Sequence, residues 1–190
     1  MKTDTKNGEI MHTIYQTRRM ILKILKPGQE DLVLNFYEKN RNFLEPLEAT
    51  RPESFYTMKY QRSNLLCEYN SFAKLQYMRY WMFLPEDPYH PLGSVSFSNF
   101  LKGAFSSCMV GYKLDERACH QGYMYEALSL LLPELNQTCH VKRVEAMVLP
   151  ENTASIRLLE RLHFLKEGYL HSFAQINGEW RDHILYTYLR

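Results

Sequence analysis

The order of segments in the second half of the chain restricts its fold more than any other feature of the sequence. Strand patterns occur at 107–114, 141–149, 164–176 and 180–189, and helix patterns at 122–135 and 153–162. Asn177-Gly178, between the last two strands, is the strongest short hairpin signal in the chain. Strands linked through helices pair in parallel, whereas a hairpin pairs its strands antiparallel. The order therefore predicts an α/β fold with a mixed sheet and flanking helices.

The first half of the chain adds more strands and two helical segments. Strand-like runs occur at 20–25, 80–84 and 92–97, and apolar residues at helical spacing occur at 29–40 and 54–78. The second helical segment shows a possible interruption near Ser63-Asn64. The strand-like runs around 80–114 are separated by turn residues, which predicts a meander. We therefore expect residues 1–19 to form a loose lead-in and residues 20–190 a single domain.

Composition restricts the class of protein. The chain has 190 residues, of which 45% are hydrophobic and 14% aromatic, enough for a sizeable core. A net charge of +2 with scattered basic residues argues against direct nucleic-acid binding. The sequence shows no signal peptide and no apolar run long enough to span a membrane, and its cysteines form no CxxC pair. These features predict a cytoplasmic protein with free thiols.

The segment Gly111–Leu128 has the order strand, polar loop and helix, and the helix opens near Gly122. A helix N-terminus presents unpaired backbone N–H groups and a positive dipole end, which suits a pyrophosphate. Gly122 lacks a Cβ atom, so its backbone is able to approach a phosphate closely. An ordinary tight connection explains the same pattern, and this segment alone does not separate the two interpretations.

The segment Leu149–Gly168 begins a second helix. Asn152 stands at the N-cap position and Ser155 lies three residues later, on the first turn. Capping chemistry accounts for both residues.

Taken together, several segments resemble the GNAT acetyltransferases, and most closely the branch that acetylates the N-terminal residue of ribosomal proteins. They are Gly111-Tyr-Lys-Leu114, Gly122-Tyr-Met-Tyr-Glu-Ala-Leu128, Glu151–Gly168 and Asn177-Gly-Glu-Trp-Arg-Asp182. The resemblance covers the chain from about Met20 to its end. It implies a GNAT-like mixed, mostly antiparallel central sheet. It also implies transfer of an acetyl group from acetyl-CoA, the cosubstrate, to an amine such as a protein N-terminal α-amine.

The resemblance also assigns cofactor-binding positions. Backbone groups of the strand would hold and polarise the thioester, the loop and helix start would hold the pyrophosphate, and one asparagine would contact the cofactor. These residues are Tyr112, Lys113 and Leu114, then His120, Gln121, Gly122, Tyr123, Met124 and Tyr125, and finally Asn152. The loop departs from the family pattern at Cys119, where Arg or Gln is usual, and at His120, where a glycine is frequent.

The resemblance implies a catalytic role for Ser155, which some relatives use to protonate the departing thiolate. The glutamate base of those relatives falls on Ala174 here. Glu45 and His171 are the remaining candidates for a base, although a surface or capping role is the favoured explanation of each.

Three functions stay open at the level of sequence. They are acetylation of a protein N-terminus, acetylation of a small amine such as a polyamine or an aminoglycoside, and non-catalytic binding of acetyl-CoA. The pairs Cys119-His120 and Cys139-His140 lack the spacing of metal ligands, so no metal is predicted.

Overall fold

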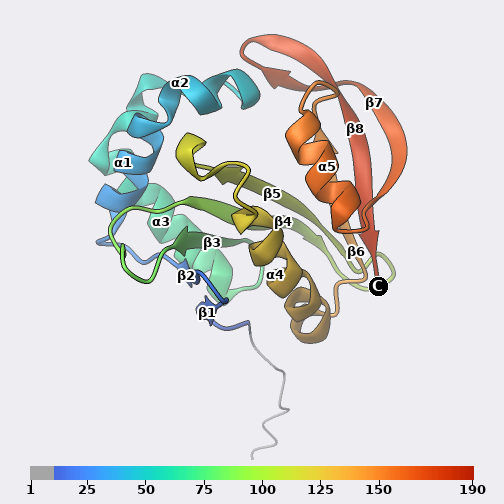
Figure 1. Ribbon diagram of the computed structural model, residues 1–190, viewed down its shortest axis with the longest axis horizontal. Coiled ribbons are helices and arrows are strands. Elements are labelled where there is room, and N and C mark those ends of the chain that lie inside the picture. The colour runs from blue at the N-terminus through green and yellow to red at the C-terminus, as the bar shows by residue number, and fades with distance from the viewer. Residues whose placement is uncertain (1–10) are drawn as a thin grey trace, which may run out of the picture.

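The computed structural model describes residues 11–190, whose strands form one eight-stranded sheet in the order β1-β2-β3-β4-β5-β6-β8-β7 (Figure 1). The strands are β1 (Ile14–Gln16), β2 (Ile21–Ile24), β3 (Met78–Phe83), β4 (Gly93–Leu101), β5 (Ser107–Leu114), β6 (Arg143–Val148), β7 (Leu165–Ile176) and β8 (Glu179–Leu189). β5 and β6 pair in parallel, and the other neighbouring strands pair antiparallel. The predicted mixed, mostly antiparallel sheet is confirmed.

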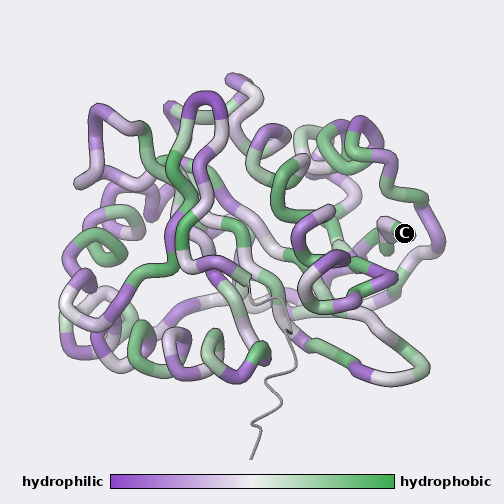
Figure 2. The backbone as a smooth tube through the Cα atoms, turned by 90° about the horizontal axis from the view of Figure 1, so that it is seen from below, coloured by the Kyte–Doolittle hydropathy of each residue, from purple (hydrophilic) through white to green (hydrophobic). Residues whose placement is uncertain are grey.

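Helices cover both faces of this sheet (Figure 1). They are α1 (Glu30–Lys39), α2 (Arg41–Leu44), α3 (Met58–Ala73), α4 (Tyr123–Cys139) and α5 (Thr153–Arg161), with 3-10 turns η1 (Glu45–Leu47), η2 (Glu53–Tyr56) and η3 (Glu116–Ala118). Along the helices in Figure 2, hydrophobic and hydrophilic residues alternate, as helices with one buried face require. No helix among residues 11–190 is long and apolar enough to cross a bilayer.

Two hydrophobic clusters form the core, one on each face of the sheet. Leu128 of α4 and Leu159 of α5 pack in the larger cluster, together with Tyr80 of β3. Phe36 of α1 packs in the smaller cluster with the next residue of β3, Trp81. Because successive side chains of a strand point to opposite faces, β3 contributes to both clusters.

The hairpin between β7 and β8 turns at Asn177 and Gly178, as the sequence predicts. Their φ angles are +49° and +83°. A two-residue hairpin turn of this kind needs positive φ at both positions, which glycine and asparagine tolerate better than other residues. Local chemistry therefore fixes this turn.

β5 and β6 run side by side only near their beginnings. Their parallel pairing joins Ser107 to Arg143, Cys108 to Val144 and Met109 to Glu145. Beyond these residues each strand pairs on its other side: Gly111 with Ser96 of β4, and Val148 with Ile184 of β8. The sheet therefore opens between the C-terminal halves of β5 and β6.

Two expectations about the first half of the chain are wrong. The expected lead-in contains β1, and both Met11 and Tyr15 are buried in the larger core cluster, where the Tyr15 ring contacts Tyr80 edge-on. Residues 1–10 of that lead-in lie outside the described residues. The expected helix at 54–78 ends at Ala73 and is preceded by η2.

The expected interruption at Ser63-Asn64 is also absent from α3. The Ser63 hydroxyl donates to the Lys59 carbonyl one turn earlier, and the Asn64 amide donates to the Glu68 carboxylate one turn later. Both polar side chains therefore bond along the helix instead of competing with it.

Candidate active site

A cavity of about 870 Å³ lies where β5 and β6 separate. Residues 110–114 of β5 and 146–148 of β6 line it, together with the N-terminal residues of α4 and α5. Phe43, Leu44, Leu47 and Glu48, from α2, η1 and the residue after it, also line it. The lining thus includes residues from the α4/α5 face and from the α1 face, so the cavity passes through the opening in the sheet.

The predicted pyrophosphate loop lies at one end of this cavity. His120, Gly122, Met124 and Tyr125 line the cavity wall. Gly122 precedes α4 with φ of +80°, a conformation that favours glycine. His120 also has positive φ, +60°, so it keeps a backbone conformation that a glycine would take readily. His120 in place of the glycine frequent in the family therefore leaves the start of α4 intact.

Gln121 and Tyr123, the other two predicted loop residues, have structural contacts. The Gln121 side chain donates to the Arg117 carbonyl at 2.6 Å, and the guanidinium of Arg19 lies over the Tyr123 ring at 4.5 Å. Gln121 also lines a second hollow of about 610 Å³ beside the loop. Arg18, Arg19 and Arg161 line this hollow together with Glu126, which pairs with Arg19. The remaining positive charge suits the phosphates of a nucleotide. Arg18 and Arg19 lie far in the sequence from Arg161 and from the loop, so no local pattern pointed to them.

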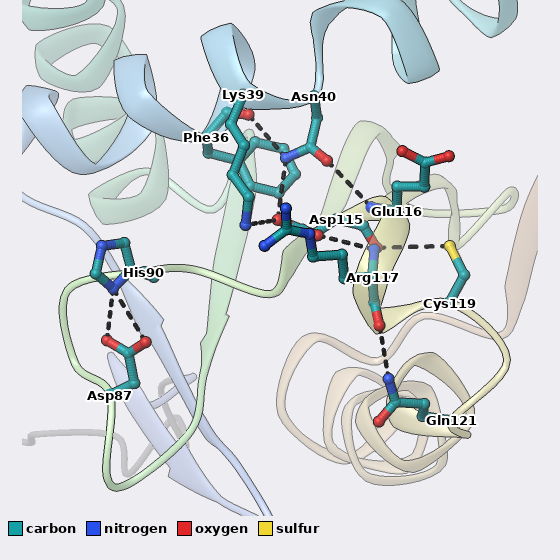
Figure 3. A network of polar contacts seen from close by, with 10 residues as sticks. All are labelled: Phe36, Lys39, Asn40, Asp87, His90, Asp115, Glu116, Arg117, Cys119 and Gln121. Carbon is teal, nitrogen blue, oxygen red and sulfur yellow. Dashed lines mark hydrogen bonds and ion pairs between the residues drawn. The ribbon is translucent and has the colours of Figure 1, made fainter.

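A polar cluster holds the start of the loop against the end of α1 (Figure 3). The buried carboxylate of Asp115 accepts hydrogen bonds from Lys39 Nζ at 2.5 Å and from the backbone N–H of Arg117 at 2.9 Å. Asn40 donates to the same carboxylate, and its Oδ1 accepts from the backbone N–H of Glu116. Burial alone would raise the pKa of Asp115, but these donors hold it below its usual range.

Asn152 and Ser155 lie together at the N-terminus of α5, and both line the cavity. The Asn152 side chain accepts from the backbone N–H of Ser155 at 3.1 Å. This is the N-cap that the sequence predicts. The cap uses the backbone of Ser155, and the hydroxyl of Ser155 takes no part in it.

Tyr112, Lys113 and Leu114 of β5 also line the cavity. Burial raises the pKa of Tyr112 to about 12, an increase that the nearby Ser155 hydroxyl partly offsets. The Tyr112 hydroxyl is buried and has no hydrogen-bond partner among residues 11–190. A buried polar group without a partner is rare in folded proteins, and a bound ligand often supplies the partner.

The other end of the cavity carries charged groups. Lys113 Nζ lies 2.5 Å from the carboxylate of Glu48, and Arg51 pairs with the same carboxylate. Burial lowers the pKa of Lys113 to about 8. One carboxylate thus faces two cations, so this end of the cavity has no excess negative charge.

Neither Glu45 nor His171, the two candidate bases, lines the cavity. Glu45 accepts from the Tyr56 hydroxyl at 2.9 Å and from Arg41 Nε at 2.8 Å, and these two donors hold its pKa below the usual range. His171 is exposed on β7, where its Nδ1 lies 3.4 Å from Asp182. The sequence indicated which segments lie near the acceptor end of the cavity, but it did not determine which way the Glu45 and His171 side chains point.

His183 of β8 and Glu48 line the cavity instead, and neither was a sequence-based candidate for the base. The side chain of His183 is buried, with 6% of its surface exposed. The alternation of side chains along β8 could have identified His183 in the sequence, because its neighbour Ile184 is a core residue and His183 therefore points to the opposite face. No cluster of three or more potential metal ligands occurs within residues 11–190.

Comparison with known proteins agrees with this arrangement. Residues 19–165 match the family described as "Acetyltransferase (GNAT) domain". The chain is 34% identical over 170 residues to the "[Ribosomal protein uS5]-alanine N-acetyltransferase" of Escherichia coli (strain K12), covering 89% of this chain and 87% of that protein.

Solved structures share the fold. A ribosomal-protein-S5-alanine acetyltransferase from Vibrio fischeri superposes with a TM-score of 0.89 and 25% identity, covering 94% of this chain and 97% of that one. RimJ of Mycobacterium smegmatis, solved in complex with CoA-disulfide, has a TM-score of 0.86 at 22% identity, covering 94% and 87% of the two chains. With the family match, the cavity and the phosphate loop in agreement, this chain belongs to the GNAT acetyltransferase family and is an acetyl-CoA-dependent N-acetyltransferase.

Proposed function

We propose that the acceptor of this acetyltransferase is the α-amino group of a protein N-terminus, and specifically of a ribosomal protein. The observation that carries the proposal is the cavity through the sheet, whose acceptor end is walled by α2 and η1 and lacks excess negative charge. The relatives from E. coli and V. fischeri are named as acetyltransferases of a ribosomal-protein alanine, which supports the same acceptor class.

The α4/α5 end of the cavity suits acetyl-CoA. Backbone N–H groups at the start of α4, with Arg18, Arg19 and Arg161, would hold its phosphates. The thioester would lie in the opening beside β5, where a backbone N–H of Tyr112, Lys113 or Leu114 polarises its carbonyl. Asn152 would contact the same cosubstrate from the start of α5.

In the proposed reaction, the hydroxyls of Ser155 and Tyr112, which both belong to the cavity lining, would lie beside the departing thiolate. The acceptor nitrogen attacks the thioester carbonyl, the C–S bond breaks, and the Ser155 hydroxyl donates a proton to the sulfur. The unpartnered hydroxyl of Tyr112 lies close enough to Ser155 to affect this donor.

The charges argue against a polyamine or an aminoglycoside as acceptor. A polycation requires several free carboxylates, as a matter of charge complementarity. Glu48 is paired with Lys113 and Arg51, while Glu45 and Glu53 both pair with Arg41. The three glutamates that are close in the sequence are therefore already neutralised.

An α-amine also suits a site without a strong carboxylate base. Its ordinary pKa of roughly 7.7–8.0 leaves an appreciable neutral fraction at neutral pH, whereas a lysine near 10.4 leaves almost none. We place the reaction in the cytoplasm, where acetyl-CoA and newly made ribosomal proteins meet; the free state of all four cysteines supports this.

The proposal is tested with matched acceptors. Peptides that copy ribosomal-protein N-termini are offered with a free α-amine, or with that amine blocked and an internal lysine left free, alongside spermine and an aminoglycoside. Release of CoA and the mass of the product are measured. We expect acetylation of the free α-amine alone. Turnover on spermine or on internal lysine, with the α-amine untouched, contradicts the proposal.

A further inference from the structure

We infer that His183 is the general base that removes the proton from the acceptor amine. This inference rests on the proposed acceptor. The imidazole lies on β8, which borders the open side of β6 through the pair Val148–Ile184. It lines the cavity and is almost fully buried within the fold.

The hydrogen bonding of the ring fixes which nitrogen is the base. His183 Nδ1 lies 3.1 Å from the carbonyl oxygen of Arg181. A carbonyl only accepts, so Nδ1 carries the proton in the neutral ring and Nε2 holds the lone pair. Nε2 has no hydrogen bond or ion pair to any residue within 11–190. The edge contact with Phe173, at 5.2 Å between ring centroids, supports the ring from β7.

His183 and the proposed proton donor to the thiolate, Ser155, belong to opposite faces of the sheet. Ile184 packs in the core cluster on the α4/α5 face, so its neighbour His183 points to the other face. Lys113 lies on that other face, because its Nζ is over the ring of Tyr37 of α1. Ser155, by contrast, belongs to α5. The base and the acid therefore approach the reacting centre from opposite sides of the sheet.

Several other titratable groups near His183 are already engaged. Glu48 is paired with Lys113 and Arg51, so its lone pairs face cations. On the strands beside His183, Arg181 pairs with Glu151 and Asp182 pairs with His171. The carboxylate of Glu116 also lines the cavity, but it lies on η3 and not on the strand that carries His183.

The step balances with groups already described. As the N–C bond forms, His183 Nε2 takes a proton from the attacking nitrogen. The C–S bond breaks, the sulfur takes a proton from Ser155, and Ser155 recovers a proton from water. The imidazolium then releases its proton to water, which replaces the proton that Ser155 took up. The neutral amine and acetyl-CoA thus give the amide and CoA thiol with no net release of protons.

The decisive variant is His183→Asn. The asparagine amide keeps a donor for the Arg181 carbonyl and removes only Nε2. We expect kcat to fall by about 10²–10⁴-fold with little change in the KM for acetyl-CoA. The pH dependence of the rate should also differ from that of the parent, while the contribution of the acceptor amine, with its ordinary pKa of roughly 7.7–8.0, remains. His90 is an exposed histidine that pairs with Asp87 (Figure 3) and does not belong to the cavity lining. His90→Asn is therefore the matched control and should behave as the parent.

A second variant keeps the inference falsifiable. His183→Ala leaves a cavity that free imidazole enters, so added imidazole should restore part of the lost rate, which a purely structural histidine does not allow. Parent-like kcat and pH profile in His183→Asn, or loss of rate without imidazole rescue in a folded His183→Ala, overturns the inference. A parent enzyme that acetylates no free α-amine refutes the proposed function instead.

Discussion

At the scale of single residues, the hydroxyl of Tyr112 is the most informative group in the site. It is buried without a partner in the described part of the chain, and such a group costs about 1–3 kcal/mol of folding free energy. Nearby Ser155 has its backbone committed to the Asn152 cap and its hydroxyl free of that cap. Neither hydroxyl is committed to a hydrogen bond of the fold among these contacts, which agrees with the roles proposed for them.

The first prediction tests whether the Tyr112 hydroxyl contributes to the reaction or to the stability of the fold. In Tyr112→Phe the unpartnered hydroxyl is removed while the ring remains, so the melting temperature should stay the same or rise. Turnover should fall, because the phenol no longer supports the thiolate donor. Tyr186→Phe is the control, since that hydroxyl bonds Glu160 away from the cavity lining. A variant with lower stability and normal turnover assigns Tyr112 to the core.

The second prediction concerns Ser155→Ala. The backbone N–H that Asn152 caps is unchanged, so stability should be close to that of the parent. Loss of the proton donor should lower kcat by about 10²–10⁴-fold with little effect on acetyl-CoA affinity. Ser63→Ala, whose hydroxyl bonds only within α3, is the control. Unchanged turnover would show that the Ser155 hydroxyl takes no part in the reaction.

At the scale of elements, the connection between β5 and α4 depends on α1. Asp115 ends β5, and its carboxylate binds Lys39 at the end of α1 and Asn40 just after it (Figure 3). The same connection leads to Gly122 and the phosphate loop. The carboxylate of Asp115, together with the Asn40–Glu116 hydrogen bond, therefore fixes the end of α1 to the connection that leads to α4.

The third prediction follows from the pKa of this carboxylate. Because the folded state holds the pKa of Asp115 below its unfolded value of about 3.9, its stabilisation is complete above that pH and is lost as the pH falls through the folded value. Asp115→Asn should therefore cost about 1–3 kcal/mol of unfolding free energy at neutral pH. Urea denaturation should show the parent and variant converging in acid. A difference that does not depend on pH would contradict the role of charge.

Comparison of the individual elements shows which of them the sequence could predict. Asn177-Gly178 and Asn152 act through local backbone chemistry, so their turn and cap were predictable. β1 was not, because in three residues with one buried side chain there is no pattern to detect. The alternation along β8 assigns His183 to one face of the sheet, but no local pattern shows that this face meets the cavity or that Glu45 lies outside it. The turn of α2 into η1 directs Glu45 toward Arg41, and the opening between β5 and β6 decides which face of β8 meets the cavity.

At the scale of the whole molecule, the eight-stranded sheet divides the site into two compartments. The phosphate loop and α5 lie on one face, while α1, Lys113 and Glu48 lie on the other. The gap that begins where β5 leaves β6, after Met109 and Glu145, connects the two faces. In the proposed mechanism the acetyl group passes directly from CoA to the acceptor amine, so no side chain of the protein is acetylated on the way.

That gap has a consequence for the order of kinetic events. Two reactants that enter from opposite sides and meet inside a sheet must be present at once, so initial-rate plots should intersect, as for a ternary complex, and parallel lines would contradict this fourth prediction. A single molecule that joins CoA to an acceptor peptide through its α-nitrogen would thread the sheet from face to face. Tethering makes the second binding event intramolecular, so such a conjugate should inhibit far more tightly than CoA and the peptide added separately.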